Sequence, residues 1–270
     1  YEAGDTPNPC IDCNRYMKFN KLYQRARELD CEYIVTGHYA RVEYDATRGR
    51  YLLKKSKNAA KDQSYVLAFL NQDQLAHTIF PLGGFASKEE VRCIADDYGF
   101  VNARKHDSQD ICFVPDGDYA DFMRHYTGKE YPAGDFVTED GKKLGEHKGI
   151  IRYTIGQRKG LGLALPAPLY VCCKDMERNE VILSSEDALF TTTCIVGDFN
   201  WIAYERPSDP VRVTAKTRYR AKEAPATARV LEDGRVELVF DEPQRAITTG
   251  QAAVLYDGEE VVGGGTIVLR

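Results

Sequence analysis

No stretch of this sequence is long and apolar enough to span a membrane, and its N-terminus lacks the charged, apolar and small-residue succession of a signal peptide. The eight cysteines are spread through 270 residues without the density of a secreted disulfide scaffold. These absences predict a cytoplasmic protein with no membrane association. Five cysteines sit in apolar or strand-like contexts and are interpreted as small core residues: Cys31, Cys93, Cys172, Cys173 and Cys194.

An excess of positive charge is also lacking. The formal net charge is -5, which argues against a protein that holds nucleic acid through its overall field. Any nucleic-acid partner must therefore be held by local basic patches. The 43% hydrophobic and 29% charged residues are ordinary for a globular chain of two or three domains.

The densest chemistry lies in the segment NPCIDCNRYMKF, residues 8–19, where Cys10 and Cys13 stand three apart. The Pro and Asn residues around them predict a tight loop, followed by a helix that begins near Asn14. The positive end of that helix, together with Arg15 and Lys18, is expected to lower the thiol pKa and make a thiolate reactive. The same C-x-x-C spacing is also typical of half of a structural zinc site, and spacing alone leaves both alternatives open.

Residues 18–29 have the apolar spacing of an amphipathic helix, and residues 31–36 predict a short buried strand that ends at Gly37-His38. A glycine at the carboxyl end of a strand is typical of the ligand crevice in an open parallel α/β sheet. His38 is either a hydrogen-bonded structural residue or a binding residue at that crevice. A hairpin is expected over residues 41–54.

Lys61, Asp62 and Gln63 precede a predicted helix over residues 64–70 and suit phosphate or ribose binding, although Asp62 could simply cap the helix. A capping box at residues 87–90 predicts a helix that extends to residue 98, with glycine as its terminator. Cys112 follows a polar run. It is either a core residue or a partner, in space, of the two earlier cysteines.

The second half of the sequence is punctuated by glycine-containing turns. A short helix near residue 119 is followed by predicted hairpins at residues 140–141 and 178–179. From about residue 195 the pattern is all β, which suggests a small closed barrel. Four cations fall on alternate positions of one expected strand and would share a face, favouring RNA phosphate over a simply solvated surface: Lys216, Arg218, Arg220 and Lys222.

Seven motifs, in this order, closely resemble those of the bacterial tRNA-specific 2-thiouridylase family: TPNPCIDCNRYMKF, TGHYAR, KDQSYVL, DSQDICF, TIGQRKGLG, KTRYR and TGQAAVLY. The resemblance covers essentially the whole chain and implies an α/β plus β fold in three parts. These are the remainder of an ATP pyrophosphatase domain (1–118), a small mixed central domain (119–194) and a C-terminal, tRNA-binding β-barrel (195–270).

The resemblance implies an enzyme that uses ATP, with Mg²⁺, to place persulfide sulfur on C2 of the wobble uridine of tRNA, and a separate protein that donates the sulfur. It assigns Cys13 as the nucleophile and Cys112 as the persulfide carrier, with a disulfide between them after transfer. Gly37 is assigned to ATP. The target base is assigned to Asn8, Pro9 and Cys10, and the tRNA contacts to His38, Lys61, Asp62, Gln63, Arg218, Tyr219 and Gln251.

Two departures from the family pattern bear on these roles. The family's SGGxDS nucleotide-binding loop does not occur in the sequence, so we expect a fragment that binds tRNA but does not thiolate it by itself. Well-studied members carry Asp where Cys10 stands, whereas others carry Cys. Cys10 is thus either a base-pocket residue or, with Cys13 and Cys112, a ligand of an iron-sulfur cluster, and we rank persulfide chemistry above the cluster. A non-enzymatic RNA-binding module with a metal-stapled C-x-x-C loop is the remaining alternative.

Overall fold

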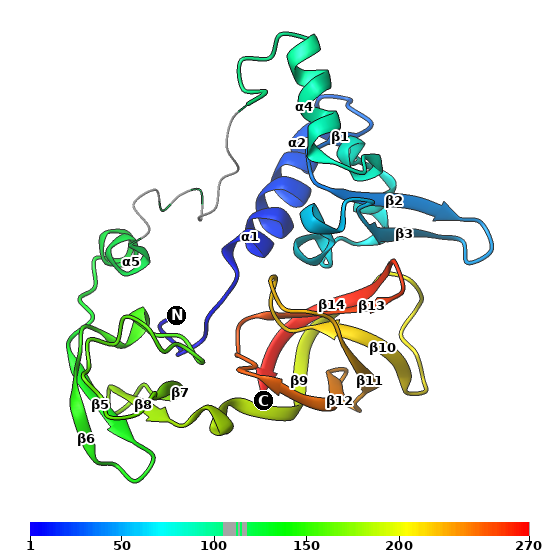
Figure 1. Ribbon diagram of the computed structural model, residues 1–270. Helices are drawn as coiled ribbons and strands as arrows, with labels where there is room; N and C mark the ends of the chain where they lie inside the picture. The colour runs from blue at the N-terminus through cyan, green and yellow to red at the C-terminus, as the bar shows by residue number, and fades with distance from the viewer. Residues whose placement is uncertain (105–111, 113, 115–117, 270) are drawn as a thin grey trace.

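The computed structural model describes residues 1–104, 112, 114 and 118–269 (Figure 1). Three hydrophobic cores organise these residues. The first is shared between the N-terminal part and the barrel, since Phe19, Tyr65 and Leu70 pack in one cluster with Val254 and Tyr256. The second fills the barrel, and the third belongs to the central part. The N-terminal part and the barrel therefore behave as neighbours across a common core.

Residues 9–28 form one continuous helical run, in which α1 (Pro9–Asp12) leads into a π-helical stretch, η1 (Cys13–Leu22), and then into α2 (Tyr23–Glu28). The expected amphipathic helix is confirmed, but its start near Asn14 is wrong. Asn8 caps the helix and Pro9 occupies the first turn, where its missing N–H costs nothing. Cys10 and Cys13 consequently lie within the helix and not in a loop before it.

The α/β sheet is represented by two short parallel strands, β1 (Ile34–Val35) and β4 (Thr78–Ile79). The predicted parallel strand before Gly37 is confirmed, but it is shorter than residues 31–36 and only half buried. Ile34 is 6% exposed and Val35 is 60% exposed. The remaining elements of this part are the hairpin β2 (Ala40–Asp45) and β3 (Arg50–Lys55), and then η2 (Ala59–Lys61), η3 (Ser64–Leu67), α3 (Gln72–Ala76), η4 (Pro81–Gly84) and α4 (Lys88–Asp97).

The helix expected over residues 64–70 is wrong, because the chain there makes only the single 3₁₀ turn η3. All seven side chains of this segment are buried, so no face is left for solvent. Tyr65 is fully buried and its hydroxyl donates to Ala252 O at 2.8 Å. Packing between the helical run and the barrel has overridden the helical periodicity. The capping-box helix α4 is confirmed, with Ser87 as its cap and Gly99 at φ +70° behind it.

The central part contains α5 (Tyr119–Thr127) and a four-stranded sheet of order β6-β5-β8-β7. Its strands are β5 (Gly134–Thr138), β6 (Lys143–His147), β7 (Tyr170–Asp175) and β8 (Glu180–Ser184), with η5 (Ile150–Arg152) before β7 and η6 (Glu186–Leu189) after β8. Both predicted hairpins are confirmed as antiparallel pairs, and β5 lies parallel to β8.

The predicted closed barrel is confirmed, and it contains six strands in the order β13-β10-β11-β12-β9-β14, closed by pairing of β13 with β14. They are β9 (Phe190–Trp201), β10 (Val211–Lys216), β11 (Ala224–Val230), β12 (Val236–Arg245), β13 (Ala252–Asp257) and β14 (Glu260–Leu269). Within the described residues, every helix is too short or too polar to span a membrane.

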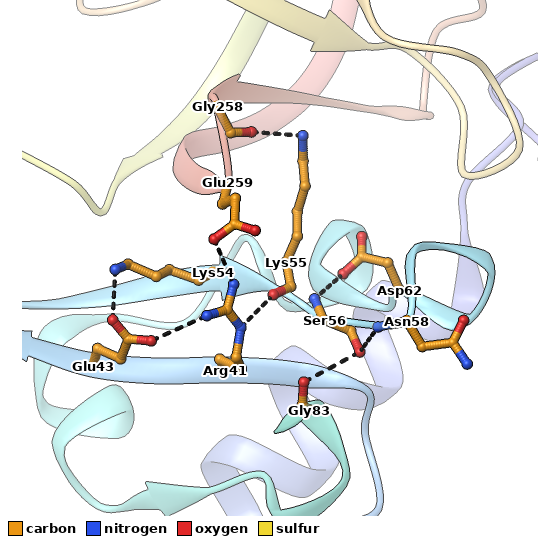
Figure 2. Close-up of polar contacts among 10 residues, drawn as sticks. All are labelled: Arg41, Glu43, Lys54, Lys55, Ser56, Asn58, Asp62, Gly83, Gly258 and Glu259. Atoms are coloured by element: carbon orange, nitrogen blue, oxygen red, sulfur yellow. Dashed lines mark hydrogen bonds and ion pairs between the residues drawn. The ribbon is translucent and has the colours of Figure 1, made fainter. Parts of the chain in front are cut away.

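Polar contacts at the β13–β14 turn attach the barrel to the β2–β3 hairpin (Figure 2). Arg41 donates to Glu259 at 2.8 Å and to the carbonyl of Lys55 at 2.8 Å. Lys55 in turn donates through Nζ to Gly258 O at 2.7 Å, and Lys54 pairs with Glu260 in the strand register of β3 and β14. The barrel is thereby held against the part of the chain that carries Cys10 and Cys13.

The interpretation of five cysteines as core residues is only partly right. Cys172 and Cys194 are buried, whereas Cys31, Cys93 and Cys173 are exposed. The prediction failed for Cys93 and Cys173 because an apolar sequence neighbourhood does not decide which side of a helix or strand a side chain occupies, and for Cys31 because it lies in the connection between α2 and β1.

Candidate thiol and RNA site

Cys10 and Cys13 lie in the first turns of the helical run, three residues apart and therefore on one side of it. Asn8 holds this start, because its side-chain oxygen accepts from the backbone N–H of Cys10 at 3.1 Å. Cys10 is exposed and Cys13 is partly exposed. The pair therefore faces outward from the helix, where another reactant can approach it.

Cys112 joins this pair in space although it lies 99 positions after Cys13 (112 − 13) in the sequence. Burial is the main factor that raises the pKa of Cys10, and the negative charges of Cys112 and Cys13 raise it further. Cys10 keeps exposed surface, but the surrounding protein desolvates its sulfur. The expectation of a lowered pKa is therefore wrong for Cys10, because burial and two neighbouring thiols outweigh the helix end and the single cation Lys18.

Lys18, and not Arg15, is the cation of this site. Arg15 is directed away from the thiols, since it pairs with Asp198 of the barrel at 2.5 Å and lies over the Phe69 ring. Lys18 stands five residues after Cys13, which in the π-helical stretch is close to one turn. Its charge acts on both Cys10 and His38. Lys18 thus lies close enough to both Cys10 and His38 for its charge to act on each of them.

The thiols do not form a ready metal site. No group of three or more His, Cys, Asp or Glu residues in the described part of the chain is arranged to hold a metal ion, and the cysteines there are free thiols. Neither the tetrahedral zinc geometry nor a thiolate cluster geometry is thus preformed around Cys10, Cys13 and Cys112. The rest of the DSQDICF motif lies outside the described residues.

Gly37 lies two residues after the end of β1, near the carboxyl end of a parallel strand where α/β proteins bind ligands. A Cβ placed there would contact only a Leu82 methyl at 3.7 Å, an ordinary van der Waals distance. Neither backbone conformation nor a neighbouring atom requires glycine at this position. The missing side chain instead leaves open space at the strand end, which suits a nucleotide.

His38 is 8% exposed, lies against the Phe19 and Phe80 rings, and shares a 2.8 Å hydrogen bond between its Nδ1 and the Thr36 hydroxyl. Burial, with a smaller effect of Lys18, lowers the pKa of His38 to about 4. The imidazole is therefore neutral at physiological pH. If His38 contacts RNA, it does so as a neutral hydrogen-bonding group and not through charge.

We expect His38 to make the fold sensitive to acid. Its folded pKa of about 4 lies below its unfolded value of 6.5, so the unfolded chain binds the proton first and stability falls as pH decreases through that window. The full effect amounts to about 3 kcal/mol. Urea unfolding of His38→Asn should lack this component of the pH dependence, whereas His125→Asn, at an exposed histidine, should retain it. Equal pH profiles for His38→Asn and the unaltered chain would contradict the assignment.

The KDQ motif contacts the barrel at the Asp62 carbonyl, which accepts from the Tyr219 hydroxyl at 3.3 Å, and two of its side chains organise the local fold. Asp62 accepts from the Ser56 N–H at 2.9 Å and from the Ser64 hydroxyl at 2.7 Å. Gln63 accepts from the Tyr39 N–H at 2.9 Å. Gln63, and not Asp62, is the N-cap residue of η3, and it makes no side-chain cap hydrogen bond, so the simple N-cap interpretation of Asp62 is wrong. Lys61 is the last residue of η2 and is partly exposed.

The basic strand expected at residues 216–222 is wrong. β10 ends at Lys216, and residues 217–223 form a turn before β11, so the four cations do not share one strand face. Lys216 lies over the Tyr65 and Tyr219 rings. Arg220 and Lys222 are exposed and make no ion pair in the described part of the chain. A turn satisfies its backbone locally, which breaks the two-residue alternation.

Tyr219 connects this turn with the thiols. Its ring is 38% exposed and its hydroxyl donates to Asp62 O at 3.3 Å. Burial is the first cause that raises the pKa of Tyr219, followed by the charges of Asp62 and Cys10. An exposed aromatic ring next to cysteine thiols and beside Lys216 is suited to stacking on a nucleotide base.

Arg218 and Gln251, both assigned to RNA by resemblance, donate hydrogen bonds to protein main chain. Arg218 donates through Nη2 to Ile155 O at 2.9 Å and Ala246 O at 2.8 Å, and burial lowers its pKa. Gln251 donates through Nε2 to Thr6 O at 2.5 Å. Pattern reading overlooked these roles, because hydrogen bonds between residues 245 positions apart leave no periodic signal.

An α/β part joined to a closed barrel, with three thiols beside an exposed tyrosine and a basic turn, defines a thiol-bearing protein with the features of an RNA-modifying enzyme. Family profiles match residues 1–116 (tRNA methyl transferase HUP domain), 120–185 (tRNA methyl transferase PRC-barrel domain) and 191–267 (aminomethyltransferase beta-barrel domain). The chain belongs to the tRNA-specific 2-thiouridylase family, as its relatives establish.

The relatives match almost the whole chain. The tRNA-specific 2-thiouridylase MnmA 1 of Thermoanaerobacter sp. (strain X514) is 53% identical over 99% of this chain and 73% of its own length. The MnmA enzymes of Acetivibrio thermocellus and Clostridioides difficile (strain 630) are 50% and 48% identical, over 99% of this chain and 74% of their lengths. The predicted resemblance and the α/β plus β fold class are confirmed.

Proposed function

We propose that this chain provides the thiols and the RNA-binding surface for ATP-dependent transfer of sulfur to C2 of the wobble uridine of tRNA, producing 2-thiouridine. One observation carries the proposal. Cys112, remote in sequence, lies close enough to Cys10 to influence its ionisation together with Cys13, and Tyr219 of the barrel lies close enough to Cys10 to be influenced by it. Sulfur relay needs two thiols that can meet, next to a surface that can hold a base.

The chemistry assigns a separate task to each thiol. The C2 oxygen of uridine is a poor leaving group until ATP adenylates it and pyrophosphate departs. The terminal sulfur of a Cys112 persulfide then attacks C2, and AMP leaves with the oxygen. The Cys13 thiolate attacks the Cys112 sulfur, breaks the sulfur–sulfur bond and leaves 2-thiouridine with a Cys13–Cys112 disulfide. An external thiol reductant restores both cysteines.

The remaining residues are assigned to the target base, to ATP and to tRNA. Asn8, Pro9 and Cys10 face the target base, and the open strand end at Gly37 takes ATP with Mg²⁺. Tyr219 and Lys61 contact tRNA, and His38 contributes as a neutral group. Asp62, Gln63, Arg218 and Gln251 shape the tRNA-binding surface through their protein hydrogen bonds. A sulfur-donor protein loads Cys112 in the cytoplasm, where tRNA is available.

If tRNA phosphates bind the turn of residues 217–223, the affinity for tRNA should depend on salt concentration through the cations of that turn. Replacing Arg220 and Lys222 together by glutamine should weaken tRNA binding and reduce the log–log salt slope by about two, since each phosphate contact releases roughly one counterion. Fluorescence anisotropy with labelled tRNA over a salt series measures both quantities. Arg218→Lys, which alters a main-chain contact, should leave the slope unchanged.

A matched double variant controls for net charge. Arg229 and Arg235 are barrel arginines that pair with Glu237 and Asp233, outside the turn. Replacing both by glutamine removes the same charge as the Arg220 and Lys222 variant, and its slope should remain that of the unaltered chain. Identical slopes for the two double variants would remove the turn from the tRNA surface and leave only a general charge effect.

A further inference from the structure

The barrel loop between β12 and β13, residues 246–251, forms hydrogen bonds with the segment that leads into the helical run carrying Cys10 and Cys13. Both backbone polar groups of Thr6 bond to this loop. Its N–H donates to Thr249 O at 3.0 Å, and its carbonyl accepts from Gln251 Nε2 at 2.5 Å. Only one residue separates Thr6 from Asn8, the cap of that helix. The position of the helix start therefore depends on a loop about 240 residues further along the chain.

Gly250 makes this close approach feasible. Its φ is +82°, and a Cβ there would lie 2.8 Å from the Asp5 Cβ, 3.0 Å from the Thr6 nitrogen and 3.2 Å from the Pro7 nitrogen. The first two distances are at or below what a real Cβ tolerates, and the obstacles are mainly backbone atoms that have no rotamer to change. Any side chain at this position must push residues 5–7 away from the barrel.

Arg218 holds the same loop from its other side. Its Nη2 donates to Ala246 O at 2.8 Å, to the Thr248 hydroxyl at 2.5 Å and to Ile155 O of the central part at 2.9 Å. The next residue is Tyr219, whose ring is exposed at the thiols. Hydrogen bonds thus join the central part, the barrel loop and the segment before Asn8, and Arg218 connects them through the backbone to Tyr219.

We propose that the loop 246–251 is a positioning element for Cys10 and Cys13, with Gly250 and Gln251 as its contact residues and Arg218 as the residue that fixes its shape. This inference rests on the proposed sulfur transfer for its purpose, and it changes the assignment of Arg218 and Gln251 from tRNA contacts to positioning residues. Its physical basis is that a thiol displaced by about 1 Å loses much of its rate advantage in an exchange reaction.

Gly250→Ala tests the proposal, with Gly141→Ala as the matched control. Gly141 has the same φ of +82° but no atom within 4 Å of its added Cβ, so the control imposes the backbone strain without the contact. Iodoacetamide labelling, with peptide mass spectrometry to separate Cys10 from Cys13, reports the surroundings of each thiol without ATP or tRNA. We expect Gly250→Ala to change at least one labelling rate by about tenfold, as expected for a displacement of this size, and Gly141→Ala to change neither.

Side-chain variants keep the test decisive if Gly250→Ala does not fold. Gln251→Met preserves length but cannot donate to Thr6 O, and Gln244→Met is its control at an exposed barrel glutamine. Arg218→Lys is compared with Arg245→Lys, because Arg245 also contacts the central part but does not contact Thr248. Gln251→Met and Arg218→Lys should alter the labelling of Cys10 or Cys13, whereas Gln244→Met and Arg245→Lys should not.

The kinetic signature separates positioning from RNA binding. In the full-length protein, Gln251→Met should lower kcat for thiolation and leave KM for tRNA within about twofold, since only the geometry of the thiols changes. A raised KM with unaltered labelling would return Gln251 to the tRNA contacts and overturn the proposal. Altered labelling in a protein that never thiolates tRNA would support the positioning role and refute only the proposed function.

Discussion

Cys112→Ser should abolish sulfur transfer to tRNA in the full-length protein, lowering turnover by at least about a thousandfold, as loss of a covalent catalyst does. A serine hydroxyl cannot carry a persulfide, so no sulfur reaches the activated uridine. ATP-dependent adenylation and tRNA affinity should remain nearly unchanged, because in the proposed mechanism Cys112 carries the sulfur but does not bind ATP or hold the tRNA. Nucleoside mass spectrometry measures 2-thiouridine, and pyrophosphate release measures adenylation.

The matched control is Cys31→Ser. Cys31 is an exposed cysteine of the same N-terminal part and lies outside the thiol group, so its replacement should leave turnover intact. Substantial thiolation by the Cys112→Ser variant would exclude this residue as the sulfur carrier. A simultaneous loss of tRNA affinity would indicate that Cys112 supports the RNA surface instead.

Cys13→Ser should stop turnover for a different reason, and it should trap the reaction one step earlier. Without the Cys13 thiolate, nothing within the site cleaves the sulfur–sulfur bond at Cys112, so the added sulfur accumulates there. Peptide mass spectrometry after incubation with a persulfide donor should find one extra sulfur atom on Cys112. Its formation requires neither ATP nor tRNA, so the measurement tests the thiol roles separately from the nucleotide chemistry.

Cys10→Ser provides the comparison within the same helix turn. Because burial raises the pKa of Cys10, its sulfur is protonated at neutral pH and is poorly suited to attack a disulfide or persulfide. This variant should therefore not accumulate the extra sulfur on Cys112. Sulfur found on Cys10 or Cys13 would overturn the role assignment, as would iron in stoichiometric amount whose removal abolishes activity.

Local chemistry explains which parts of the fold were predicted correctly. The hairpin turns at residues 46–49 and 140–141, the cap at Ser87 and the glycine behind α4 each depend on neighbours within a few residues. Turn and cap preferences act over this range, so the sequence carries them directly. The closed barrel follows from several such turns in succession, because regularly spaced strands have few ways to satisfy their edges.

Predictions that depended on periodicity alone failed where another part of the chain covered the expected solvent face. Residues 64–70 are apolar at helical spacing, but the barrel and the helical run bury the whole segment and leave a single 3₁₀ turn. Residues 216–222 carry a cation at every second position, but β10 ends at the first of them, Lys216. A periodic pattern specifies one buried face only when the opposite face meets water.

The sequence by itself determined the motif order, the family, the α/β plus β fold class and the identity of the residues that can do sulfur chemistry, because these depend on residue type and local order. Only the tertiary structure decided that Cys112 joins Cys10 and Cys13, and that Arg15 turns to Asp198 while Lys18 stays with the thiols. In an α-helix, residues five apart point about 140° from each other, whereas the π-helical stretch brings such residues close to one turn apart. Likewise, Gln251 reaches Thr6 only because the barrel packs against the N-terminal part across a shared core.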